Sequence, residues 1–184
     1  MTRCVGVLAL QGGFAAHAAA LTAAGCAARA VRSAAEFTGL GGLVLPGGES
    51  TVQLRLLERH GLVGALSLLV SSGAPVLATC AGLILCSKSV EHPEQPSFGY
   101  LNVAVARNGW GRQVDSFEAI ADDGVTPLVF IRAPRILRTG PGVEVLCRFD
   151  GEPVFVRQNN VFGATFHPEL APGSRIHERV FSST

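Results

Sequence analysis

The stretch Val76-Leu77-Ala78-Thr79-Cys80-Ala81-Gly82-Leu83 has the pattern of a short buried strand that turns directly into a helix. The small side chains on either side of Cys80 leave room for a tight turn. A strand-to-helix turn of this kind presents the residue at its apex as a nucleophile. The start of the helix favours negative charge, so the thiolate form of Cys80 is favoured there. The alternative is that Cys80 is one more buried thiol, which is a common position for free cysteine.

Apolar runs and helical stretches alternate outward from this turn. We expect strands over residues 4–10, 27–31, 43–45 and 75–78, and helices over residues 14–24, 51–60, 62–71 and 81–86. This alternation predicts a parallel sheet with helices on both faces. The second half has strand-like runs over residues 101–107, 113–120, 128–131, 143–148, 153–157 and 161–166, which indicate an antiparallel extension. We therefore expect an α/β fold: one three-layer α/β/α domain over residues 1–184, with a mainly parallel central sheet.

The composition excludes several classes of protein. The chain has 184 residues, of which 48% are hydrophobic, and a formal net charge of +1, so it is one folded domain rather than a disordered chain. A net charge this low does not indicate binding to nucleic acid or to an anionic membrane. The five cysteines lack zinc-site spacing, so we expect no metal and a reducing, cytoplasmic location. The apolar run over residues 4–10 only loosely mimics a signal peptide, because Gln11 and two glycines interrupt it.

His167, Pro168 and Glu169 supply the groups that a thiol nucleophile needs. Pro168 favours an extended backbone at His167, and residues two apart on an extended segment lie on the same side. A carboxylate beside an imidazole orients the ring and stabilises its protonated form. The alternatives are a surface ion pair and two ligands of a metal. Together with Cys80, these residues fill the three roles of nucleophile, base and orienting group.

A glycine-rich stretch, Pro46-Gly47-Gly48-Glu49-Ser50-Thr51, follows the strand expected over residues 43–45. Tandem glycines let backbone N–H groups approach a ligand, and ligands bind at strand ends in open α/β sheets. The stretch is therefore a candidate oxyanion-binding loop. It fits equally well as an ordinary turn with Ser50 or Thr51 as the helix N-cap. Its spacing does not match a phosphate-binding P-loop.

Taken together, these residues resemble a known family. Thr79-Cys80-Ala81-Gly82-Leu83 and His167-Pro168-Glu169 are similar to the triad of class I glutamine amidotransferases. Further stretches resemble the glutaminase subunit of pyridoxal 5′-phosphate synthase: Leu8-Ala9-Leu10-Gln11-Gly12, Leu45-Pro46-Gly47-Gly48-Glu49-Ser50-Thr51, Gly111-Arg112-Gln113-Val114-Asp115-Ser116-Phe117-Glu118 and Phe130-Ile131-Arg132-Ala133-Pro134. The resemblance covers residues 5–181. It departs from the usual pattern at Ala16, Trp110 and Asn159, and in a short C-terminal helix.

The resemblance implies a catalytic role for each matching residue. Cys80 is expected to be the nucleophile, His167 the base and acid, and Glu169 the orienting partner of His167. The backbone N–H groups of Gly48 and Ala81 are expected to form the oxyanion hole. Glutamine would be hydrolysed through a γ-glutamyl thioester, with ammonia leaving as His167 donates a proton.

The resemblance also implies where glutamine binds. The expected contacts are Gly48, Glu49, Ser50, Arg107, Ile131 and Arg132. Free glutamine carries a positive and a negative end, so a carboxylate at Glu49 and a guanidinium at Arg107 or Arg132 suit it.

The expected partners are L-glutamine and a separate TIM-barrel synthase subunit, which receives the ammonia and makes pyridoxal 5′-phosphate. No cofactor is expected in this chain. The single lysine, Lys88, supports this division, because Schiff-base chemistry on sugar phosphates needs a lysine and Lys88 lies just beyond the elbow helix. Two alternatives are a glutaminase subunit of another biosynthetic amidotransferase and a non-catalytic regulatory subunit on the same fold.

We also expect the synthase to activate the chain. The peptide between Gly47 and Gly48 has more than one accessible orientation, and an oxyanion hole works only if its N–H donors face the developing charge. Gln11 and Gly12, at the end of the first strand, are the candidate contacts through which the partner acts on this loop.

Overall fold

The elements follow the order that the sequence predicts through the first half of the chain. The computed structural model describes residues 2–109 and 116–182. Within these residues the strands are β1 (Cys4–Leu8), β2 (Ala27–Val31), β3 (Gly42–Leu45), β4 (Val76–Thr79), β5 (Ser87–Glu91), β6 (Leu101–Ala106), β7 (Ser116–Ile120), β8 (Pro127–Ile131), β9 (Arg135–Thr139), β10 (Glu144–Phe149), β11 (Glu152–Gln158) and β12 (Val161–Ala164). The α-helices are α1 (Phe14–Ala23), α2 (Ser50–Arg59), α3 (Val63–Ser71), α4 (Ala81–Cys86) and α5 (Ile176–Phe181), with 3₁₀ turns η1 (Ala34–Phe37) and η2 (Pro168–Leu170).

A central sheet, seven-stranded over the described residues, has the order β10-β11-β12-β4-β3-β1-β2. The strands from β12 to β2 pair in parallel, and β10 and β11 continue the sheet in antiparallel pairing. The central strands β3 and β4 are buried along their whole length, as expected for strands covered on both faces. The predicted α/β fold with a mainly parallel sheet and an antiparallel extension is confirmed.

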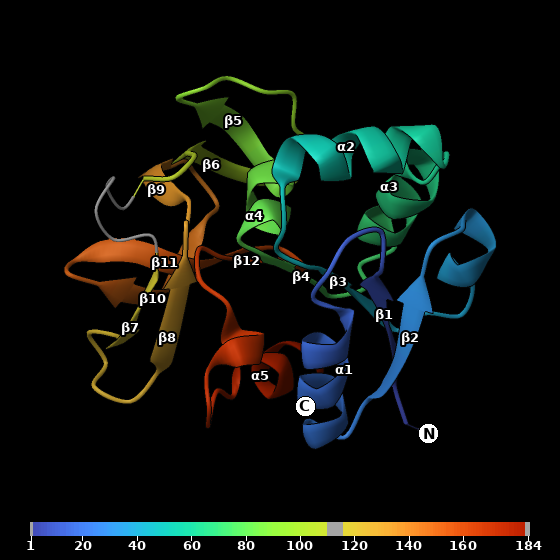
Figure 1. The fold of residues 1–184 in the computed structure, drawn as a ribbon, viewed down its shortest axis with the longest axis horizontal. Helices are drawn as coiled ribbons and strands as arrows, with labels where there is room; N and C mark the ends of the chain where they lie inside the picture. The colour runs from blue at the N-terminus through green and yellow to red at the C-terminus, as the bar shows by residue number, and fades with distance from the viewer. Residues whose placement is uncertain (1, 110–115, 183–184) are drawn as a thin grey trace.

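Helices cover both faces of this sheet (Figure 1). Helices α2, α3 and α4 pack on one face, in a buried cluster that includes Leu57 and Leu66. Helices α1 and α5 pack on the other face, in a cluster that includes Leu21 and Phe181. Across residues 2–109 and 116–182, no helix is both long and apolar enough to cross a membrane.

The second half of the chain differs from the prediction in two respects. The sequence analysis assigns residues 161–166 to the antiparallel extension, but β12 pairs parallel to β4 and is part of the central sheet. Strands β5 and β9 are not predicted, because exposed Lys88, Ser89 and Arg138 interrupt any apolar pattern. They pair with β6 in a small separate sheet, and β7 pairs with β8 in another. Residues 110–115, which include Trp110 and most of the family-like stretch that ends at Glu118, lie outside the described residues.

The turn between β4 and α4 has the strained backbone of a nucleophile elbow. Cys80 has φ 48° and ψ −104°, a positive φ that non-glycine residues rarely adopt. Gly82 makes the turn possible, because a Cβ at this position would overlap the carbonyl oxygen of Leu45 at the end of β3. Helix α4 therefore begins in direct backbone contact with β3, and no side chain larger than hydrogen fits between them.

We predict that Gly82→Ala destabilises the protein by about 1–3 kcal/mol, the usual cost of overpacking a buried site. Gly64→Ala is the matched control. Gly64 also lies in a helix, but no atom lies within 4 Å of an added Cβ, so alanine should stabilise the protein by about 0.5–1 kcal/mol. Denaturant unfolding of both variants measures the difference. Equal changes in the free energy of unfolding would contradict the close packing of α4 on β3.

Candidate active site

The Cys80 side chain is 6% exposed and lies at the start of α4. Its Sγ is 3.9 Å from the carbonyl oxygen of Ile131, which ends β8. Two other cysteines are in environments that oppose thiolate formation. Burial raises the pKa of the Cys86 thiol to about 12, and it raises that of Cys147 to about 11, where nearby Asp123 adds to the effect. Cys86 and Cys147 are therefore core thiols, whereas Cys80 lies at the turn between β4 and α4.

His167 lies between Cys80 and Glu169. Its Nδ1 is 2.7 Å from Glu169 Oε1, and its backbone N–H donates to the carbonyl oxygen of Val129 at 2.8 Å. Burial lowers the pKa of His167, but hydrogen bonds with Cys80 and Glu169 outweigh it and raise this pKa to about 10. The raised pKa favours the imidazolium form of His167 at neutral pH, held between the Cys80 sulfur and a carboxylate. It carries the proton that a leaving amine needs.

Glu169 reaches His167 by a different backbone path from the predicted one. The sequence analysis places both residues on an extended segment, whereas Glu169 lies in the 3₁₀ turn η2, which starts at Pro168. Pro168 keeps His167 out of the helical conformation, and the turn folds the carboxylate back toward the ring. Burial raises the pKa of Glu169, but the hydrogen bond to His167 and the electrostatic interactions with His17 and His167 lower it below its usual value.

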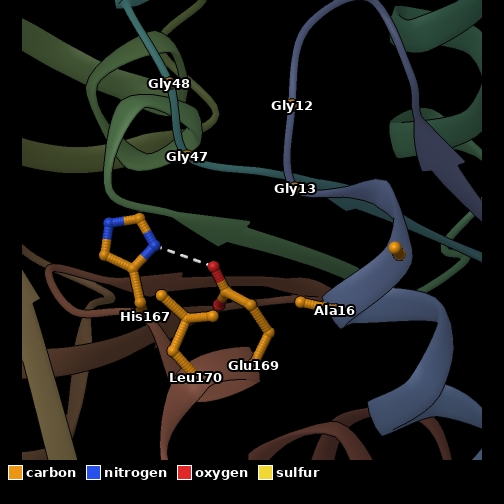
Figure 2. A pocket seen from close by; sticks show the side chains of 9 residues that line it. Gly12, Gly13, Ala16, Gly47, Gly48, His167, Glu169 and Leu170 are labelled. Carbon is orange, nitrogen blue, oxygen red and sulfur yellow. Dashed lines mark hydrogen bonds and ion pairs between the residues drawn. The ribbon is translucent and has the colours of Figure 1, made fainter.

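A cavity of about 480 Å³ opens beside this histidine–glutamate pair (Figure 2). Glycines from two loops line one side of it: Gly12, Gly13, Gly47 and Gly48. An added Cβ at Gly47 would overlap the ring of His167 and lie 3.4 Å from Cys80 Cβ. The glycine-rich loop after β3 therefore passes directly over His167 and Cys80. Gly48 has φ 145°, a conformation that favours glycine.

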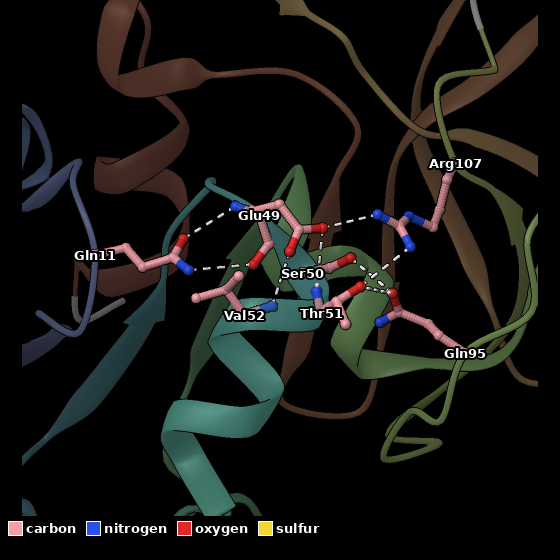
Figure 3. A network of polar contacts seen from close by, with 7 residues as sticks. All are labelled: Gln11, Glu49, Ser50, Thr51, Val52, Gln95 and Arg107. Atoms are coloured by element: carbon pink, nitrogen blue, oxygen red, sulfur yellow. Dashed lines mark hydrogen bonds and ion pairs between the residues drawn. The ribbon is translucent and has the colours of Figure 1, made fainter. Parts of the chain in front are cut away.

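The start of α2 is capped by Glu49 and not by Ser50 or Thr51, so the predicted N-cap is wrong. The Glu49 carboxylate accepts hydrogen bonds from the backbone N–H of Thr51 at 3.3 Å and of Val52 at 2.8 Å (Figure 3). The Ser50 hydroxyl donates instead to Gln95 Oε1 at 2.8 Å. Gln95 is 45 residues away in a loop, and no sequence pattern points to it.

Glu49 and Arg107, which are expected to bind opposite ends of glutamine, contact each other in the structure. The Arg107 guanidinium donates to Glu49 Oε1 at 2.8 Å and to Thr51 Oγ1 at 3.2 Å (Figure 3). Burial raises the pKa of Glu49, but the N–H groups of Val52 and Thr51 and the charge of Arg107 lower it below the usual range. Glu49 is therefore an anion that holds the Arg107 guanidinium beside the start of α2.

The remaining predicted site residues are next to Cys80, Ile131 or Glu49 in the structure. Ala81 is buried directly after Cys80, and Arg132 follows Ile131 with a positive φ of 43°. Gln11 lies in the loop after β1, which ends at Leu8 and not at the predicted Leu10. Its Oε1 accepts from the Glu49 N–H at 3.0 Å and its Nε2 donates to the Glu49 carbonyl at 3.3 Å. Residues 2–109 and 116–182 hold no cluster of side chains suited to a metal ion.

Comparison with known proteins agrees with this geometry. Residues 7–183 match the model of the SNO glutamine amidotransferase family. A protein of Methanothrix thermoacetophila named "Pyridoxal 5'-phosphate synthase subunit PdxT" is 44% identical over 98% of this chain and 100% of its own length. A protein of the same name from Corynebacterium jeikeium is 47% identical over 95% of this chain and 93% of its own. The chain belongs to the SNO glutamine amidotransferase family.

Solved structures carry the same fold. One described as "Crystal structure of glutamine amidotransferase" superposes with a TM-score of 0.89 at 44% identity, over 96% of each chain. The structure of PurLQS from Thermotoga maritima has a TM-score of 0.71 at 17% identity over 98% of this chain and 96% of that one, which shows the fold alone. The SNO family match begins within β1 and continues past α5, so it includes every site residue named above.

Two buried histidines beneath the site are not predicted from the sequence. His17 on α1 and His177 on α5 are 0% and 2% exposed, and their rings are joined by a 2.9 Å contact between His17 Nδ1 and His177 Nε2. Burial lowers the pKa of each histidine to about 4, with a further lowering of the His177 pKa by His17. In the sequence, a lone histidine on an apolar stretch gives no indication that its side chain contacts another histidine.

These two pKa values predict acid destabilisation. Between pH 6 and pH 5 both histidines are protonated in the unfolded chain but not in the folded chain. The free energy of unfolding therefore decreases as the pH is lowered. The slope should approach about 1.4 kcal/mol per pH unit for each histidine. Urea unfolding at several pH values measures it, and the exposed His60 replaced by Ala is the control that should keep the slope. A flat profile would contradict the buried neutral pair.

Proposed function

We propose that this chain is the glutaminase subunit of pyridoxal 5′-phosphate synthase. The observation that carries the proposal is the Cys80 elbow facing the hydrogen-bonded pair of His167 and Glu169. The near full-length relatives named as subunits of that synthase support the same reading. The chain would hydrolyse L-glutamine to L-glutamate and deliver the ammonia to a synthase subunit.

The proposed reaction uses three side chains in sequence. The Cys80 thiolate attacks the carboxamide carbon, and the resulting oxyanion is held by the N–H groups of Gly48 and Ala81. The C–N bond breaks as His167 donates its proton, which releases ammonia and leaves a γ-glutamyl thioester. His167 then takes a proton from water, which attacks the thioester and frees glutamate and the thiolate. Glu169 keeps the His167 ring oriented and stabilises its positive form.

Glutamine binding is assigned to the mouth of this site. Arg107 keeps three of its five N–H groups after its contacts with Glu49 and Thr51, enough to hold the α-carboxylate in a two-point contact. The Glu49 carboxylate retains acceptor capacity for the α-ammonium group. Gly48, Ser50, Ile131 and Arg132 complete the proposed glutamine site, and the Ile131 carbonyl is already beside the thiol.

The proposed partner is a TIM-barrel synthase subunit, and the proposed location is the cytoplasm. Five free thiols support a reducing compartment. The net charge of +1 supports neither nucleic acid nor an anionic membrane as a partner. The only lysine of the sequence, Lys88, lies exposed on β5, which leaves carbonyl chemistry on sugar phosphates to the partner.

Replacement of the nucleophile tests the proposed activity. Cys80→Ala should lower kcat for ammonia release from glutamine by about 10⁴- to 10⁶-fold while the chain stays folded. Cys86→Ala is the matched control, since it removes a buried thiol from the same helix region and should cost packing energy with little effect on kcat. Enzymatic assay of released ammonia compares them. Loss of activity in Cys86→Ala with retention in Cys80→Ala would overturn the assignment.

The proposed function also predicts that the synthase partner activates the chain. Gln11, in the loop after β1, holds both backbone groups of Glu49, so a partner docking at Gln11 and Gly12 would act on the glycine-rich loop next to the Gly47–Gly48 peptide. We expect saturating synthase to raise kcat about 100- to 1000-fold, the value of one oxyanion donor. A change within about twofold would mean that the hole is already formed. Gln11→Ala should reduce the activation ratio, whereas Gly47→Ala is unsuitable because its Cβ would strike His167.

A further inference from the structure

A continuous line of buried polar groups extends from the catalytic pair into the core. His17 comes from α1, and His177 comes from α5, 160 residues later in the chain. His17 is 0% exposed, and a buried imidazole needs hydrogen-bonding partners to offset its desolvation. The reaction proposed above uses neither ring.

The distances connect this pair to Glu169. Glu169 Oε1 is in contact with His167, and its other oxygen, Oε2, lies 3.5 Å from His17 Nε2. Figure 2 shows the Glu169 carboxylate between the His167 ring and helix α1, which carries His17. The same His17 nitrogen is 3.5 Å from the hydroxyl of Thr79, the last residue of β4. The order of the groups is thus His167, Glu169, His17 and His177.

The negative charge of Glu169 favours one arrangement of protons along this line. Both His17 and His177 are neutral at pH 7, so each ring has one N–H donor and one bare nitrogen. Glu169 is ionised and can only accept. A bare Nε2 would face the ionised carboxylate, so His17 directs its Nε2–H toward Glu169 Oε2 and Thr79 Oγ1, each 3.5 Å away, and its bare Nδ1 accepts from the Nε2–H of His177. Two buried atoms of this line lack a hydrogen-bond partner among the described residues: His177 Nδ1, which is the bare nitrogen left over, and Glu169 Oε2, which faces His17 Nε2 at 3.5 Å.

We propose that His17, oriented by His177, is a positioning residue for catalysis that holds the second oxygen of Glu169 and so keeps the first aimed at His167. This inference rests on the proposed glutaminase function. A neutral donor suits the task better than a lysine or arginine, because a cation would compete with the His167 imidazolium for the single charge of Glu169. Burial is the main cause of the lowered His17 pKa, and repulsion from the His167 imidazolium lowers it further, so His17 stays a neutral donor.

The kinetic test uses His17→Phe, which keeps a ring but removes the donor. We expect kcat for glutamine hydrolysis by the complex with the synthase to fall about 10- to 100-fold, with KM unchanged, as for loss of a hydrogen bond to a charged group. The acid limb of the pH profile should move to higher pH, because Glu169 loses a donor that stabilises its ionised form. The titratable groups around Glu169 that take part are His167, His17 and, one contact further, Cys80 and His177.

Three further variants separate positioning from simple packing. His17→Gln restores a neutral N–H donor and should return the acid limb toward the wild-type position. His177→Phe removes the group that orients His17 and should produce a smaller shift in the same direction. Leu66→Ala removes a buried side chain on the opposite face of the sheet, so it should lower thermal stability without moving the pH profile.

A spectroscopic measurement tests the proton arrangement without reference to activity. Nitrogen NMR of the imidazoles should find the Nε2–H form for both His17 and His177 at pH 7, and an Nδ1–H form of His17 would overturn the proposal. The proposal would also be overturned if the wild type is active and folded His17→Phe has the same kcat and pH profile. That result would leave the glutaminase assignment intact. An inactive wild-type complex would instead count against the proposed function itself.

Discussion

The backbone of Cys80 is the constraint on which the rest of the site depends. A positive φ at a non-glycine residue costs on the order of 1–3 kcal/mol and persists only where the surroundings enforce it. Here the buried strand β4 fixes one side of the turn, and the contact between Gly82 and Leu45 fixes the other. The turn directs the thiol away from the core that buries Cys86, toward the ends of neighbouring strands.

The parallel sheet then brings the other groups to the same place. β12 and β3 are the two neighbours of β4, so the residues that follow them meet at Cys80. After β12 the chain reaches His167 and the turn that carries Glu169. After β3 it enters the glycine-rich loop, whose backbone lies against the His167 ring. Ligands of open α/β sheets bind at this carboxyl edge for the same geometric reason.

Local chemistry in the sequence predicts most elements of the first half and the contact between His167 and Glu169. The elbow, the alternation of strands and helices, and the pairing of His167 with Glu169 all depend on residues close together in the chain. Contacts between distant segments escape the same reasoning. The parallel pairing of β12 with β4, the link from Ser50 to Gln95, and the meeting of His17 with His177 are set by tertiary packing. The N-cap is missed because serine and threonine are favoured caps, whereas here the longer Glu49 side chain folds back to accept from the N–H groups of Thr51 and Val52.

The most direct test of the account is covalent labelling with a glutamine analogue that carries a diazoketone in place of the carboxamide. Such a compound binds as glutamine does and alkylates the nucleophile that attacks it. Mass spectrometry of the digested chain should find one adduct, on Cys80, whose formation excess glutamine prevents and His167→Ala slows. An adduct on Cys4, which is partly exposed, or labelling that glutamine does not prevent would contradict the assignment of Cys80 as the nucleophile of a glutamine site.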